Sequence, residues 1–138
     1  MSHRRAVALE WLGKGMQFSA EGTDPVAPAI TIDGDGETGP SPMLTLLMAA
    51  AACSASDVVH ILQKMRVKLR GLRLEVDGIR RTDEPRRYMS IGFRYLVAGD
   101  GVTLPQAERA VALSLEKYCS VVHTLAPDVV LTHEVRLG

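Results

Sequence analysis

The sequence predicts an α+β fold in one domain, with antiparallel sheets around a long central helix. The chain has 138 residues, of which 46% are hydrophobic, enough for one core that buries roughly two thirds of the unfolded surface. Alternating apolar and polar residues, typical of strands, flank two stretches with the three- and four-residue apolar spacing of helices. No internal repeat or linker is visible, so we expect residues 1–138 to form a single domain.

The first third of the chain predicts three strands. Residues 6–11 and 16–21 flank the segment Leu12–Gly15, whose two glycines can supply the positive φ of a tight hairpin. Residues 29–33 predict a third strand. The segment from Asp33 to Pro42 is rich in glycine and proline and predicts an irregular loop.

A long helix is predicted from Pro42 to about Met65. Ser41 can cap its first amide groups, and proline is tolerated at the first helical position. The first half, to Cys53, is apolar on every side, whereas the second half is amphipathic. Because so small a chain has little material to cover such a helix, we expect a partner chain to cover part of it.

The middle of the chain predicts a pair of strands after this helix. Residues 67–76 and 89–97 alternate between apolar and charged or polar side chains on either side of a turn at Pro85. Such alternation is typical of antiparallel strands with one solvated face.

The last third predicts a second helix and a final strand. Thr103 and Pro105 open the helix, and apolar residues at three- and four-residue steps, with Cys119 on the same face, continue it to Leu125. Residues 129–137 alternate again and predict the terminal strand.

Charge and composition exclude several classes of partner. The 16 basic and 16 acidic residues cancel, so no net field attracts a phosphate backbone or an anionic membrane, and we expect neither partner. The apolar run from Met43 to Cys53 is shorter than the roughly 20 residues that span a bilayer. Two cysteines are too few for a disulfide-stapled secreted scaffold, and no signal peptide follows the first residues, so we expect a cytoplasmic protein.

The two cysteines, Cys53 and Cys119, are the candidate reactive groups, and both fall in segments predicted as buried helix. Free cysteine often packs as a small hydrophobic residue, so two unrelated buried thiols are one interpretation. The other is a redox couple, in which Cys53 attacks a peroxide, becomes a sulfenic acid and is resolved by Cys119 as a disulfide. That chemistry requires Cα atoms within about 7 Å.

Histidines near the cysteines raise two further possibilities. His60 follows Cys53 by seven residues and His123 follows Cys119 by four, and two cysteines with two histidines can form a tetrahedral zinc site. Zinc ligands usually come in tight pairs in short loops, so we predict no metal and no cofactor. Asp57 completes a Cys–Asp–His row with His60, but a hydrolase triad normally draws its members from different elements, which favours a polar stripe instead.

Four segments of the chain form a specific combination: Gly39–Pro42, the apolar stretch ending at Cys53, the segment Ser54–Arg66 and the segment Leu113–Val121. Together they resemble the OsmC/Ohr family, and particularly its YhfA-like branch. The resemblance covers the chain from about Gly39 to Leu125. It implies an OsmC-like α+β fold in which two chains interlock as a homodimer around the long helix, with each active site at the subunit interface.

The resemblance also implies an activity. Family members of known activity reduce small organic hydroperoxides under oxidative stress, so by position Cys53 would be peroxidatic and Cys119 resolving, with a dithiol reductant of the lipoyl or thioredoxin type. In those peroxidases an arginine from the N-terminal strands and a glutamate after the motif proline activate the thiolate. Here Met43 follows Pro42, and the hairpin offers Lys14. We therefore expect a slow peroxidase; the alternative is a non-catalytic binder of a small hydrophobic or sulfur-containing ligand.

Overall fold

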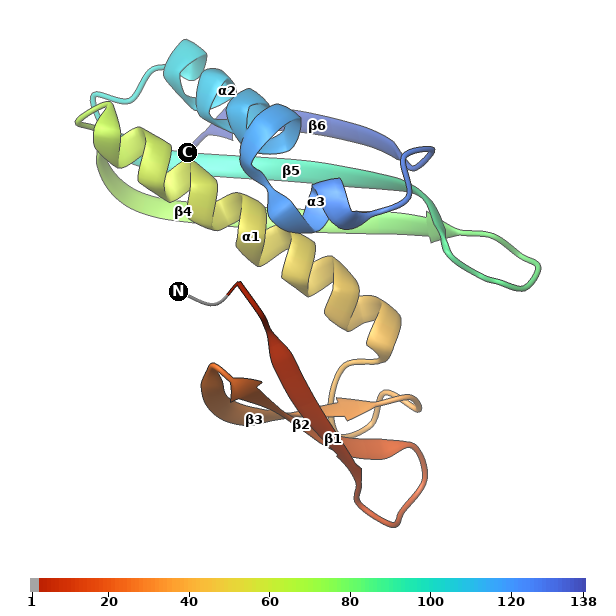
Figure 1. Ribbon diagram of the computed structural model, residues 1–138. Helices are drawn as coiled ribbons and strands as arrows, with labels where there is room; N and C mark the ends of the chain where they lie inside the picture. The colour runs from red at the N-terminus through yellow and green to blue at the C-terminus, as the bar shows by residue number, and fades with distance from the viewer. Residues whose placement is uncertain (1–2) are drawn as a thin grey trace. The chain divides into compact units, whose positions relative to one another are not determined.

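The computed structural model describes residues 3–138, which divide into two compact units, one up to Leu46 and one from Leu47 onward. Figure 1 shows the order of the elements along the chain. They are β1 (Ala6–Trp11), β2 (Gln17–Asp24), β3 (Val26–Asp33), α1 (Pro42–Lys64), β4 (Lys68–Arg80), β5 (Tyr88–Asp100), α2 (Leu104–Leu113), the π-helix η1 (Ser114–Tyr118), α3 (Ser120–Thr124) and β6 (Val130–Leu137). The predicted α+β class and the predicted order of elements are confirmed.

The unit up to Leu46 is built on an antiparallel sheet in the order β1-β2-β3. Gly13 and Gly15 in the first turn have φ values of 80° and 51°, as the hairpin prediction requires. After β3, Asp33 accepts hydrogen bonds from the backbone N–H groups of Asp35, Glu37 and Thr38. These bonds, with that of Thr38 foremost, lower the pKa of the Asp33 carboxyl and fix the loop that leads to α1.

This unit exposes most of its large apolar side chains. Val7, Leu9 and Trp11 of β1 are 79%, 60% and 59% exposed. Among residues 3–46, Asp33 is the only buried residue. A three-stranded sheet without buried apolar side chains lacks the main favourable contribution to its own folding.

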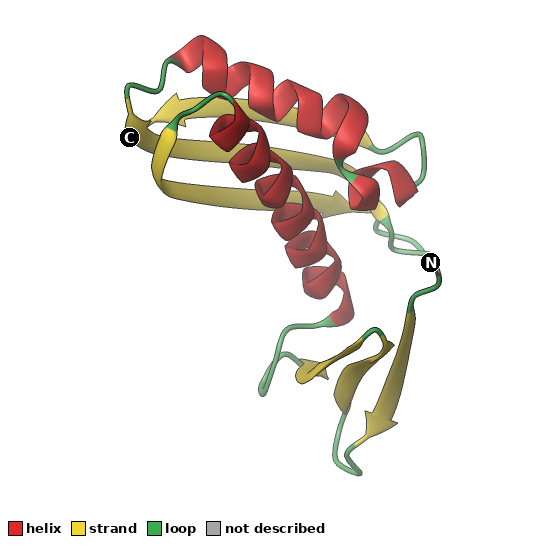
Figure 2. Cartoon of the chain, turned by 60° about the vertical axis from the view of Figure 1, so that its left-hand side comes forward, coloured by secondary structure: helices red, strands yellow, loops and turns green. Residues whose placement is uncertain are grey.

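The unit from Leu47 onward contains the buried core. Its sheet has the order β4-β5-β6, and Figure 2 shows helices covering one face of it. β4 and β5 pair antiparallel as predicted, but β6 pairs parallel to β5, so the sheet is mixed and not wholly antiparallel. The reason is the connection: the helical segment after β5 returns the chain to the end of the sheet where β5 began. Alternate residues of β5 face the helices and are buried, namely Ile91, Phe93, Tyr95 and Val97.

Helix α1 begins and ends as its sequence predicts. The Ser41 hydroxyl accepts from the N–H of Leu44 at 3.3 Å, and Pro42 is the first helical residue. At the other end Arg66, with φ 64°, and the bond from Val67 N–H to the Leu62 carbonyl close the helix in a Schellman arrangement. One buried stripe recurs at three- and four-residue steps: Leu47, Ala50, Ser54, Val58 and Leu62.

By length and composition alone, α1 could cross a bilayer. Core helices often have the same length and apolar composition, and α1 carries a buried stripe as a core helix does. Its other faces carry exposed apolar residues, including Leu44 and Met48, which are 51% and 54% exposed.

The predicted second helix is not continuous. Thr103 caps α2 with a capping box formed with Gln106, but the helix then widens into η1 and stops at Cys119. Cys119 has φ −72° and ψ 101°, an extended conformation, so it lies between two helices and not within one. The Cys119 N–H bonds to the Ser114 carbonyl at 2.7 Å, five residues back, which is the wider turn of a π-helix.

Leu62→Ala should test the packing of α1. Leu62 is fully buried, so the truncation should lower the free energy of unfolding by about 2–5 kcal/mol through lost burial and the cavity left behind. Chemical denaturation measures this difference. The exposed neighbour Gln63 supplies the control, since Gln63→Ala should change stability by less than about 0.5 kcal/mol; equal effects would place Leu62 outside the core.

Candidate functional site: a thiol pair beside a buried hydroxyl chain

The structure brings the two cysteines together from separate segments. Cys53 lies on α1, one residue before the buried Ser54, and is half-buried. Cys119 follows η1 and is completely buried. The two thiols are free, and Cys53 lies near enough to Cys119 to raise the pKa of the Cys119 thiol.

Burial raises the pKa of the Cys119 thiol to about 11. The N–H of Val122 opposes this shift, whereas the hydrogen bond with Cys53 and the nearby Asp57 carboxylate add to it. Cys119 is therefore a protonated thiol at neutral pH. A thiol of this kind is a poor first nucleophile.

A chain of hydrogen-bonded hydroxyls lies beside the thiol pair. The Tyr95 hydroxyl is 2.6 Å from the Ser54 hydroxyl, which is 2.8 Å from the Ser114 hydroxyl. Ser114 in turn donates to the Asp57 carboxylate at 2.9 Å. The first three residues are buried, and Asp57 is half-buried at the open end. This row of hydrogen bonds thereby links α1, β5 and η1.

The direction of these hydrogen bonds follows from counting protons. Ser114 uses its single hydroxyl proton on Asp57, so Ser54 must donate to Ser114. Tyr95 must then donate to Ser54. Burial raises the pKa of Tyr95 to about 12, which keeps the phenol protonated for this role. Each buried hydroxyl in the chain has a partner, as the cost of burying polar groups requires.

Ser54, Tyr95 and Ser114 were not predicted as site residues from the sequence. The available signal was the position of the two serines on apolar faces: Ser54 belongs to the buried stripe of α1, and Ser114 lies between the buried Val111 and Leu115. A hydroxyl at such a position needs a buried partner. Which partner it finds depends on the packing of three elements and was not visible in the sequence.

The histidine-based alternatives do not assemble. His60 and His123 are both exposed, and within residues 3–138 no group of three or more His, Cys, Asp and Glu side chains could hold a metal ion. Asp57 accepts a hydrogen bond from Ser114, so this one residue of the polar stripe on α1 belongs to the row of hydrogen-bonded hydroxyls.

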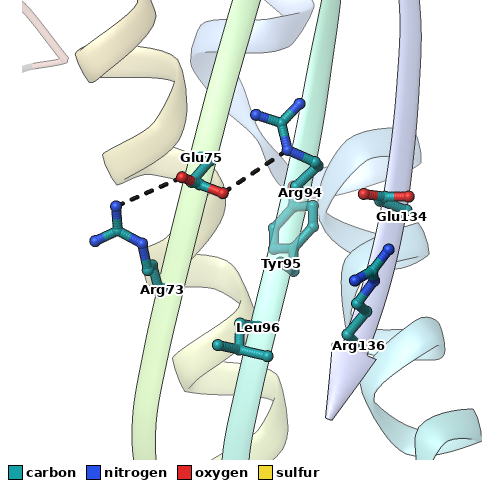
Figure 3. A pocket seen from close by; sticks show the side chains of 7 residues that line it. All are labelled: Arg73, Glu75, Arg94, Tyr95, Leu96, Glu134 and Arg136. Carbon is teal, nitrogen blue, oxygen red and sulfur yellow. Dashed lines mark ion pairs between the residues drawn. The ribbon is translucent and has the colours of Figure 1, made fainter. Parts of the chain in front are cut away.

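Hollows within residues 3–138 also lie away from the thiol pair. One, of about 350 Å³, is on the solvated face of the sheet, where Figure 3 shows Arg73 and Arg94 directed at Glu75. Their ion pairs, at 3.5 Å and 3.8 Å, confirm that acidic residues offset the basic ones on this face. Another hollow, of about 220 Å³, lies against α3 and is lined mainly by apolar residues, among them Val122 and Leu125.

Comparison with known proteins places this α+β thiol protein in a family. The family model described as OsmC-like protein matches residues 34–134, and the chain belongs to that family. It is 39% identical over 126 residues to the protein YhfA of Escherichia coli (strain K12), covering 91% of this chain and 92% of that one.

Solved structures agree in fold. A hypothetical protein from Aquifex aeolicus VF5 has 32% identity and a TM-score of 0.83, with 99% of each chain covered. The organic hydroperoxide resistance protein OhrB of Bacillus subtilis has 18% identity and a TM-score of 0.63, covering 96% of this chain and 98% of that one. The predicted OsmC-like fold is thus confirmed.

The raised pKa of Cys119 predicts its reactivity toward iodoacetamide. Only the thiolate reacts, and at pH 8 a thiol with a pKa of about 11 is ionised to roughly one part in a thousand. In Cys53→Ser, alkylation of Cys119 measured by mass spectrometry should rise with pH well beyond pH 9. Removing the carboxylate with Asp57→Asn should move this profile to lower pH, because a nearby negative charge raises the pKa. If alkylation of Cys119 in Cys53→Ser reached a plateau below pH 9, the raised pKa assigned to this buried thiol would be wrong.

Proposed function

We propose that this protein is a thiol peroxidase that reduces organic hydroperoxides through a cycle of Cys53 and Cys119. The contact between two thiols carried by different segments is the observation that supports it most. Family membership supports it at a coarser level, since the OsmC/Ohr family includes proteins described by their resistance to organic hydroperoxides. We assign the activity to the cytoplasm, where reduced thiols persist.

The cycle has three balanced steps. The Cys53 thiolate attacks one peroxide oxygen, the O–O bond breaks, and the alkoxide takes a proton and leaves as an alcohol, with Cys53 oxidised to a sulfenic acid. The Cys119 sulfur then attacks the Cys53 sulfur. The S–O bond breaks, and the hydroxide leaves as water with the proton from Cys119. A dithiol reductant, of the lipoyl or thioredoxin type, reduces the disulfide by exchange.

The environments of the two thiols support this division of roles. Cys53 is half-buried and so accessible to a small peroxide, whereas Cys119 is completely buried and protonated. A buried thiol beside the sulfenic acid can attack it without first meeting the peroxide. Met43 occupies the place of the family's activating glutamate, which supports a slow first step.

We further propose that the chain works as a homodimer. The apolar side chains left exposed on β1 and on the first half of α1 need cover, and a second copy supplies a surface of matching composition. We also propose that residues 1–138 form a single domain, which comprises the two compact units on either side of Leu46.

The alternative function is binding without turnover. The apolar hollow against α3 favours it, because Val122, whose N–H bonds to the Cys119 sulfur, also lines that hollow. A small hydrophobic or sulfur-containing ligand would lie there with the cysteines as neighbours.

Turnover with cumene hydroperoxide and dihydrolipoamide separates the two functions. The wild-type chain should consume peroxide and form an internal Cys53–Cys119 disulfide, detected by mass spectrometry. Cys53→Ser should abolish consumption, because the attacking sulfur is gone. Cys119→Ser should still oxidise at Cys53 but stop at a sulfenic acid that dimedone traps. If the wild type consumes no more peroxide than Cys53→Ser does, the function is binding without turnover.

Sedimentation tests the proposed assembly. We expect a dimer that persists at micromolar concentration, with more than roughly 2,000 Å² buried in total, as in obligate interfaces. Trp11, at 59% exposure in the single chain, should report the same burial through a blue-shifted fluorescence. A folded monomer at micromolar concentration would refute the dimer.

A further inference from the structure

We propose that Ser114 is a positioning residue that holds the Cys119 segment against α1 and so sets how readily Cys119 forms a disulfide with Cys53. This inference rests on the proposed cycle and adds to it a residue, Ser114, that touches neither peroxide nor sulfur in the resolving step. Asp57 and Ser54 are the two anchors that it uses.

Ser114 connects the two cysteine-bearing segments in both directions. Its side chain bonds to Ser54 at 2.8 Å and to Asp57 at 2.9 Å, and both of these partners are on α1. Its carbonyl accepts the N–H of Cys119 at 2.7 Å. Ser114 therefore connects the two cysteines through hydrogen bonds. Its side chain bonds to Ser54, the neighbour of Cys53, and its carbonyl bonds to the main chain of Cys119.

The surroundings make this connection rigid. Ser54 and Ser114 are completely buried and cannot exchange their partner for water. Tyr95 fixes the Ser54 hydroxyl from the opposite side at 2.6 Å. The N–H of Cys119 bonds to the Ser114 carbonyl and its own carbonyl accepts from the N–H of His123, so its backbone bonds hold it to η1 and α3 but not to α1. The bonds at Ser114 supply that restraint.

The restraint should appear in the equilibrium of the thiol pair. A tethered Cys119 has a higher effective concentration at Cys53, which favours the disulfide. Ser114→Ala removes the side-chain hydrogen bonds between the segments, so the equilibrium constant for the internal disulfide should fall about tenfold or more. Formation of the Cys53 sulfenic acid precedes this step and should keep its rate.

Glutathione buffers provide the measurement. The fraction of Cys53–Cys119 disulfide is determined by alkylation and mass spectrometry across ratios of oxidised to reduced glutathione. Ser114→Ala should need a more oxidising ratio, by about tenfold or more, than the wild type. Asp57→Ala removes one of the two anchors and should need a shift of about threefold. In the Cys119→Ser background, adding Ser114→Ala should leave dimedone trapping of Cys53 unchanged.

Two control variants separate positioning from general loss of stability. Ser56→Ala removes a hydroxyl from the same helix that bonds only to the Ala52 carbonyl, so the equilibrium should not change. Tyr95→Phe cuts the far end of the chain but leaves both bonds between Ser114 and α1, so it should lower stability while the disulfide equilibrium stays within about twofold of the wild type.

The positioning role is wrong if Ser114→Ala and Asp57→Ala have the same glutathione equilibrium as Ser56→Ala. It is also wrong if Tyr95→Phe shifts the equilibrium as much as Ser114→Ala does. If Ser114→Ala does not fold, Asp57→Ala decides. A wild-type chain that forms the disulfide with glutathione but not with cumene hydroperoxide would remove the peroxidase cycle and leave the tether standing.

Discussion

The packing of the buried Ser54 hydroxyl between Tyr95 and Ser114 is the constraint on which the site depends. It joins α1 to the central strand of the β4-β5-β6 sheet inside an otherwise apolar interface, where a misplaced hydroxyl would be costly. That cost selects one rotation of the helix over the sheet. With α1 rotated in this way, Cys53 is directed toward the end of η1 and Ser114 finds its two partners. A buried polar group here gives specificity to a packing that apolar contacts alone would leave less defined.

The elements of the fold were predictable because each has a local cause in the sequence. Ser41 and Pro42 at the start of α1, and Thr103 with Gln106 at the start of α2, are visible as capping patterns. The parallel pairing of β6 was not, because pairing direction depends on where a connection returns the chain. The break at Cys119 was also missed. The apolar spacing runs through it unchanged, and only the extra hydrogen-bond step at η1 reveals it.

In the candidate site, the two cysteines could be singled out from the sequence, but the hydroxyl groups beside them could not. Cys53 and Cys119 are rare residue types in recognisable surroundings, so the sequence pointed to them directly. Serine and tyrosine are common and have many structural roles, so Ser54, Ser114 and Tyr95 acquire meaning only through their distances. A candidate residue of a rare type can thus be singled out from one sequence, whereas the groups around it need a structure.

The π-helix before Cys119 makes the site sensitive to chain length. A π-turn contains one residue more than the α-turn it replaces, and each residue of an α-helix rotates the chain by about 100°. Deleting a single residue within Ser114–Tyr118 would restore an α-helical turn and rotate everything after it by that angle. The apolar face could adjust, but the Cys119 thiol would leave Cys53. An insertion or deletion at η1 would therefore separate the two thiols while sparing the fold.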